Sequence, residues 1–79
     1  MQNNTLFGME TYSHRAVLGE RIRRLREEQG LSQRKLALMA DTNQTHLWQI
    51  ESGRANVGID LLYRLASALG VRVQDLIDF

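Results

Sequence analysis

The stretch from residue 32 to residue 53 constrains the fold of this chain more than any other part. It contains two short segments with apolar residues at helical spacing, separated by a polar tripeptide. At about 3.6 residues per turn, Leu36 and Ala40 would share one side of the first helix, and Leu47 and Ile50 one side of the second. Each apolar stripe is narrow. The stretch therefore predicts two short amphipathic helices joined by a tight turn.

Local signals mark the ends of the expected helices. Ser32 and Asn43 are good N-cap residues, because their side-chain oxygens can accept from a free backbone N–H of the first turn. Asp41 tolerates left-handed backbone better than most residues, which suits the turn. Gly30 and Gly70 predict left-handed C-caps for the two neighbouring helices.

The outward side of the second helix carries amides instead of the glutamate and lysine of a typical solvated surface. This side and the first turn hold Gln44, Thr45, Trp48 and Gln49. Glutamine can pair in a bidentate manner with adenine, and threonine can contact the methyl group of thymine. These residue types predict a face that reads base edges in DNA. The alternative is an ordinary polar helix on a small bundle.

Length and composition exclude several classes of protein. A chain of 79 residues is one small domain at most. It has no cysteine, and His14 and His46 lie far apart, so we expect neither a metal site nor a cofactor. No run is apolar enough to span a membrane, and no secretory signal is visible, which predicts a cytoplasmic location. No set of residues suited to catalysis is present, so we expect no enzyme.

Charge is distributed unevenly although the net charge is only +1. Most of the lysines and arginines precede residue 55, whereas Asp60, Asp75 and Asp78 lie after it. This asymmetry is typical of a domain with one side facing phosphates and another facing away from them.

Several segments, spread over most of the chain, match a single known sequence pattern in both residue type and spacing. They are the run LGERIRRLREEQGLSQ at 18–33, Leu36-Ala37, Leu47, Ile50-Glu51, Gly53 and LASALGV at 65–71. Together they resemble the lambda-repressor-like helix-turn-helix family, often called the Xre family. The runs 45–47 and 54–57 are similar to the controller proteins of restriction–modification systems. The resemblance implies an all-α fold, a compact bundle of about five short helices that contains a helix-turn-helix.

The resemblance also implies a function. The chain would be a sequence-specific transcriptional regulator that binds double-stranded DNA as a homodimer, on a roughly palindromic operator, with its third helix in the major groove. Base contacts would come from the four residues named above. Backbone contacts would come from Gln33, Asn43, His46 and Arg54, and Gln33 would also brace Gln44. For Arg54, the alternative is an ordinary solvated arginine.

Trp48 has two interpretations, because a large aromatic is costly to leave exposed. It can meet DNA, through a sugar or a thymine methyl, or it can fold over Leu36 or Met39 and shield the core. In the second case base reading would fall mainly to Gln44, Thr45 and Gln49.

By resemblance, Arg26 of the first helix pairs with Glu51 at the end of the third helix. A half-buried guanidinium needs a carboxylate partner, and planar bidentate pairing suits it. The alternative is two solvated surface charges.

The remaining segments complete the expected domain at residues 14–79. The first helix would run from Ser13 or His14 to Gln29, preceded by a flexible arm at 1–13. The alternative to a free arm is one that packs on a partner or follows DNA. A fourth helix would run from Ile59 to Leu69. Its core stripe would be Ile59, Leu62, Leu65, Ala66 and Leu69, with Leu61 and Ala68 off the stripe.

A short last helix would begin raggedly after Arg72 and end at Ile77. Apolar residues near the C-terminus outnumber what one terminal turn can hide, which predicts an isologous dimer contact. The candidate interface residues are Leu61, Val73, Leu76, Ile77 and Phe79. The alternative is that they all close the core of the monomer.

A second functional hypothesis is an antitoxin-type module that binds a partner protein and regulates its own promoter. Leu38 and Met39 would lie on the outer side of their helix, where relatives are commonly charged. Leu6 and Phe7 of the arm, or a second protein, would cover them. Scattered apolar surface residues are also normal.

Overall fold

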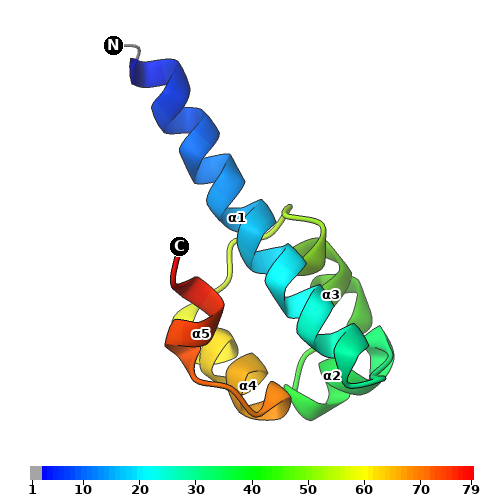
Figure 1. The fold of residues 1–79 in the computed structure, drawn as a ribbon. Helices are drawn as coiled ribbons and strands as arrows, with labels where there is room; N and C mark the ends of the chain where they lie inside the picture. Colours follow the sequence, from blue (N-terminus) through cyan, green and yellow to red (C-terminus); the bar gives the residue numbers. More distant parts are fainter. Residues whose placement is uncertain (1–2) are drawn as a thin grey trace.

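The computed structural model describes the backbone of residues 3–79 and the side chains of residues 14–79. Within this range the chain forms five helices and no strand (Figure 1). They are α1 (Asn3–Glu28), α2 (Gln33–Met39), α3 (Gln44–Glu51), α4 (Ile59–Leu69) and α5 (Val73–Ile77). The predicted fold class, an all-α bundle with a helix-turn-helix, is confirmed.

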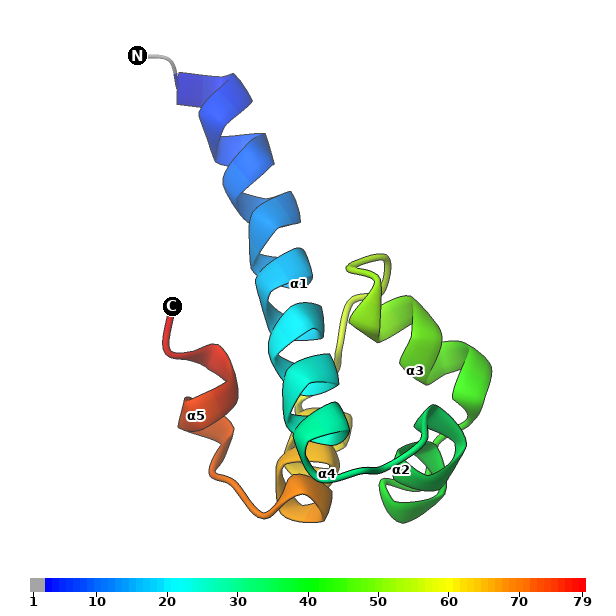
Figure 2. The ribbon, with the colours of Figure 1, turned by 45° about the vertical axis from the view of Figure 1, so that its right-hand side comes forward.

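The second half of α1 organises the bundle. It packs against α3, α4 and α5, while α2 packs against α3 and α4. Figures 1 and 2 show the first half of α1 extending well beyond the other helices, with α3 and α5 on different sides of it. No helix among the described residues combines the length and apolar character needed to cross a membrane.

The start of α1 differs from the prediction. The helix begins at Asn3 and not at Ser13 or His14. No proline interrupts residues 3–13, and an existing helix can propagate through backbone hydrogen bonds without an apolar stripe to mark it. That residues 1–13 act as a separate arm stays a prediction. The proposal that Leu6 and Phe7 cover Leu38 concerns side chains outside the described residues.

The core draws on all five helices. Its fully enclosed large side chains are Ile22, Leu36, Leu47, Ile50, Leu65 and Leu76. Burying one such side chain is worth about 1.5–3 kcal/mol. A core of this size suits a small domain without disulfides.

Four positions in α4 and α5 depart from the predicted pattern. Ile59 is 62% exposed, whereas Leu61 and Ala68 are partly buried against the core. Ile59 is the first residue of α4, one turn before the first buried residue, so helical spacing alone does not place it against another element. Leu76, predicted in the dimer interface, is instead fully enclosed in the monomer core.

The predicted caps and turns are confirmed. Ser32 Oγ accepts from the backbone N–H of Lys35 at 3.0 Å, and Asn43 Oδ1 accepts from that of His46 at 2.8 Å. Asp41 adopts the left-handed conformation in the turn between α2 and α3, with φ of 56°. These contacts satisfy backbone donors that a helix start would otherwise leave free.

The start of α5 is capped, contrary to the predicted ragged start. The Asp75 carboxylate reaches back and accepts from the backbone N–H of Arg72 at 2.9 Å. This is the reciprocal half of a capping box, supplied by the acidic residue three positions on. It does not require a serine-like residue at position 72.

Gly19 lets α1 touch the backbone of α3. A Cβ at this position would lie 2.2 Å from the carbonyl oxygen of Ile50 and 2.7 Å from that of Glu51. Neither distance can hold a methyl group. The C-terminal end of α3 therefore rests directly on α1 because position 19 has no side chain.

The residues that follow α5 contact α1. Arg21 forms an ion pair with Asp78, and its guanidinium carbon lies 5.4 Å from the centroid of the Phe79 ring. The His14 ring lies 5.5 Å from the Phe79 ring on a centroid-to-centroid measure. Together with buried Leu76, these contacts hold α5 beside α1.

Candidate functional site

The exposed side of α3 forms a polar face. Gln44, Thr45 and Gln49 are exposed, and Trp48 among them is 46% exposed. A hollow of about 260 Å³ lies at the N-terminal end of this face, lined by Gln33, Gln44, Thr45 and Trp48. The structure thus brings the four predicted base-contacting residues to one surface, next to Gln33 of α2.

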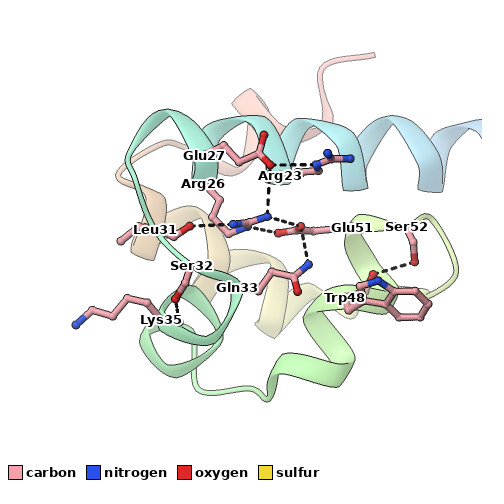
Figure 3. A network of polar contacts seen from close by, with 10 residues as sticks. All are labelled: Arg23, Arg26, Glu27, Leu31, Ser32, Gln33, Lys35, Trp48, Glu51 and Ser52. Carbon is pink, nitrogen blue, oxygen red and sulfur yellow. Dashed lines mark hydrogen bonds and ion pairs between the residues drawn. The ribbon is translucent and has the colours of Figure 1, made fainter.

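An enclosed charge pair holds α3 in place (Figure 3). Arg26 donates from Nε to Glu51 Oε2 at 2.7 Å and from Nη2 to Oε1 at 3.0 Å. Its Nη1 donates to the carbonyl of Leu31 at 2.8 Å. The side chains of Arg26 and Glu51 are only 11% and 3% exposed. The structure therefore brings together the pair that the family resemblance implied, in bidentate geometry.

The hydrogen-bonded Glu51 carboxylate raises the pKa of the Arg26 guanidinium, an effect that partial burial opposes and that the charges of Glu51 and Glu27 reinforce. A raised pKa contributes stability that is lost only as pH rises through the folded-state value. Arginine is ordinarily protonated throughout the range in which proteins are folded. The stabilisation from Arg26 protonation is consequently constant through neutral and mildly alkaline pH.

Gln33 extends the pair toward the surface. Its Nε2 donates to Glu51 Oε1 at 3.0 Å. It was predicted to brace Gln44, but the structure shows its amide bonded to Glu51, because the carboxylate lies within reach and is a charged acceptor. Gln33 and Gln44 still line the same hollow. Its phosphate contact stays a prediction.

Trp48 lies at the surface and is not buried over the core. The Arg54 guanidinium carbon sits 5.1 Å from the centroid of the indole, a cation–π contact between α3 and the following loop. Figure 3 shows the indole projecting away from the Arg26–Glu51 pair, on the side of Ser52. Of the two interpretations of Trp48, the structure agrees with the exposed one.

His46 was predicted to contact the DNA backbone, and that contact stays a prediction. The residue is half-buried, and its Nε2 is enclosed by protein without a hydrogen-bond partner. That nitrogen is not available to a phosphate in this conformation. Asn43 and Arg54, by contrast, are exposed.

Two positioning residues were missed by sequence reasoning. Arg64 of α4 donates from Nε to the carbonyl of Ala40 at 2.8 Å, which satisfies a free acceptor at the end of α2. Gln29 donates to the carbonyl of Leu69 at 2.7 Å and does the same for α4. Both contacts join distant parts of the chain, so no local pattern could have revealed them.

The five predicted dimer residues differ in how far they are exposed. Ile77 and Phe79 are exposed, Leu61 and Val73 are half-buried, and Leu76 is in the core. Tyr63 of α4 adds an exposed aromatic that sequence reasoning did not include. A hollow of about 450 Å³ lies between α4 and α5, lined by Tyr63, Ala66, Ser67, Val71, Arg72, Val73 and Gln74.

Comparison with known proteins matches the same region. A family model described as helix-turn-helix matches residues 22–76. Control protein C.BamHI of Bacillus amyloliquefaciens is 37% identical over 70 residues, covering 87% of this chain and 86% of that protein.

Two solved structures agree closely with the fold. The restriction-modification controller protein C.AhdI from Aeromonas hydrophila has 32% identity and a TM-score of 0.79, covering 82% of this chain and 94% of that chain. The clp gene regulator ClgR from Corynebacterium glutamicum has 33% identity and a TM-score of 0.78, covering 81% and 68%. The predicted resemblance, including that to controller proteins, is confirmed.

Proposed function

This chain belongs to the helix-turn-helix family of DNA-binding transcription regulators, and from that premise we propose that it binds a roughly palindromic operator as a homodimer, with α3 in the major groove. The family consists of regulators and not of enzymes. By similarity to the controller proteins, we further propose that the genes it regulates include those of a restriction–modification system.

The exposed face of α3 is the observation that carries this proposal. Gln44, Thr45 and Gln49 have free hydrogen-bonding groups suited to base edges, on a helix slim enough to enter the major groove. The enclosed contact between Arg26 and Glu51 supports the helix from behind. A helix held this firmly loses little further freedom on binding, which favours affinity.

Backbone contacts would fix the register of the helix on the duplex. Asn43 and Arg54 are exposed at opposite ends of α3. Such contacts carry no sequence information, but they make binding depend on salt, because neutralised phosphates release counterions. Gln33 would join them by turning its amide from Glu51 toward a phosphate.

A homodimer would place two recognition helices in successive major grooves, about 34 Å apart. Exposed Ile77, Phe79 and Tyr63 supply apolar surface for an isologous contact, with half-buried Val73 and Leu61 at its edge. All five lie on α4, α5 or the final residues. They would leave α3 free for DNA.

Binding-site selection from random duplex DNA tests the proposal. We expect a two-fold symmetric motif whose affinity falls steeply with salt. Gln44→Ala should then relax specificity at one position in each half-site by about 1–3 kcal/mol. Leu38→Ala, at an exposed position off the α3 face, serves as the control. A folded protein that enriches no motif would refute the stand-alone regulator.

The exposed pair Leu38 and Met39 favours a second candidate function, that of an antitoxin-type protein that also binds a partner. Both lie on the outer side of α2 and are exposed. Leu38→Gln, which adds no charge beside the DNA-facing residues, would then abolish partner binding while leaving operator affinity unchanged. Pull-down with the product of a neighbouring gene, followed by this variant, separates the two functions.

A further inference from the structure

We infer that Trp48 reads the methyl group at C5 of a thymine, so that each operator half-site carries a thymine against the indole. This inference rests on the proposed function, since it specifies what one residue of the α3 face recognises. It also distinguishes Trp48 from its neighbours, which recognise hydrogen-bonding groups.

The position of Trp48 is the first argument. It lies one turn after Gln44 and Thr45 on the same face of α3, so all three approach the same stretch of a bound duplex. Its indole is nearly half exposed in the free protein. Among the groups that bases present in the major groove, the thymine methyl is the apolar one. An exposed indole on a groove-facing helix therefore has one apolar counterpart there.

The hollow beside the ring is the second argument. It measures about 260 Å³ and is lined by Gln33, Gln44, Thr45 and Trp48. A base edge entering this space would meet hydrogen-bonding side chains together with the tryptophan. Thymine has the matching edge, with an O4 acceptor beside its methyl group.

Arg54 supplies the third argument. Its guanidinium stacks on the indole at 5.1 Å, so the ring is held in position before DNA arrives. Ordering a free side chain on binding would lower the affinity, and a ring already held in place avoids that loss. The stack also brings a positive charge to the same edge of the site. Arg54 is thus a positioning residue for Trp48 as well as a candidate phosphate contact.

Replacing thymine by deoxyuridine tests the inference, because deoxyuridine lacks only the methyl group. In the operator obtained by selection, each thymine is replaced in turn and the dissociation constant is measured by fluorescence anisotropy. Burying one methyl group corresponds to an affinity change of about four-fold. We expect that loss for one thymine per half-site, and about 15-fold when both half-sites are changed.

Trp48→Ala completes the cycle. This variant should bind the operator more weakly and show no further loss when that thymine becomes deoxyuridine. Leu38→Ala should keep the full four-fold loss. Trp48 is the single tryptophan of the chain, so unmodified protein gives a second readout. Its emission should shift to shorter wavelength with the thymine operator and less with the deoxyuridine operator.

The outcomes are distinct. A protein that selects no duplex overturns the proposed function and this inference with it. A protein that binds its operator with the same affinity after every deoxyuridine substitution overturns this inference alone. So does a Trp48→Ala protein that retains the full methyl discrimination, because another residue must then contact the methyl group.

Discussion

Arg26 and Glu51 join α1 to α3 through charges that are nearly enclosed by protein. Glu51→Gln keeps the shape but leaves the guanidinium without its counter-charge, and removal of one partner from a buried pair costs about 3–5 kcal/mol. Because Arg26 retains some exposure, we expect the lower end of this range as the loss in free energy of unfolding. Urea denaturation at pH 7 measures it.

Glu27→Gln is the matched control for this prediction. The Glu27 carboxylate lies 3.9 Å from Arg26 but is more than half exposed, and exposed pairs contribute about 0–1 kcal/mol. Equal losses for the two variants would contradict the role assigned to Glu51. Replacing Arg26 and Glu51 together by Met should recover much of the loss, since apolar side chains leave no charge stranded.

At the scale of single residues, the sequence predicted which residues form the site better than it predicted which partners their side chains contact. The residues of the α3 face and the Arg26–Glu51 pair could be identified, because helical spacing and family resemblance bear on them directly. The bond from Gln33 to Glu51 and the stacking of Arg54 on Trp48 could not. Long polar side chains choose among several partners, and that choice depends on distances that exist only after the helices have packed.

The start of α3 is the element on which base reading depends. Asn43 caps it by accepting from His46 N–H, and Asn43→Ala should reduce the free energy of unfolding by about 1 kcal/mol. Asn43→Asp should keep the cap, since Asp and Asn cap equally well, but its carboxylate would face the phosphates. We therefore expect unchanged thermal stability and at least about ten-fold weaker operator binding. Calorimetry and anisotropy measure the two effects.

Either of two results would show that Asn43 only caps the helix. In the first, Asn43→Asp binds the operator as well as the unmodified protein. In the second, Asn43→Ala and Asn43→Asp each lose operator affinity in proportion to their loss in free energy of unfolding. Ser32→Ala is the control for capping, because Ser32 begins α2 by the same kind of contact.

The ends of helices were predictable wherever a nearby residue, such as a capping residue or a glycine, determines them. Capping oxygens and glycines with positive φ act within one turn, so the ends of α2, α3 and α4 could be read from the chain. The start of α1 at Asn3 could not be predicted, because no residue in this segment signals where the helix begins. Exposure of Ile59 and burial of Leu76 depend on which element lies opposite, information that helical spacing does not contain.

At the scale of the whole molecule, the core and the proposed dimer contact meet on α5. Leu76 points into the core, while the next residue, Ile77, points outward. We expect Ile77→Lys to weaken self-association by about 2 kcal/mol, or about 30-fold, because a buried lysine would lack a partner. Sedimentation equilibrium measures the association, and operator affinity should fall in parallel.

Leu38→Lys is the control, as it adds the same charge to an exposed leucine on α2, away from α5. It should sediment as the unmodified protein does. An Ile77→Lys protein that still forms dimers of full strength would locate the contact elsewhere and leave Ile77 as an ordinary exposed residue.

The close approach at Gly19 bears on how new operators could be evolved. Because α1 meets backbone carbonyls of α3 there, the docking does not depend on which side chains α3 displays outward. A library that randomises positions 44, 45, 48 and 49 should therefore yield mostly folded variants with altered sequence preference. Position 19 should return glycine alone, since even alanine would force two backbones apart. The recognition surface can vary because the contact behind it depends on a single fixed residue, the glycine at position 19.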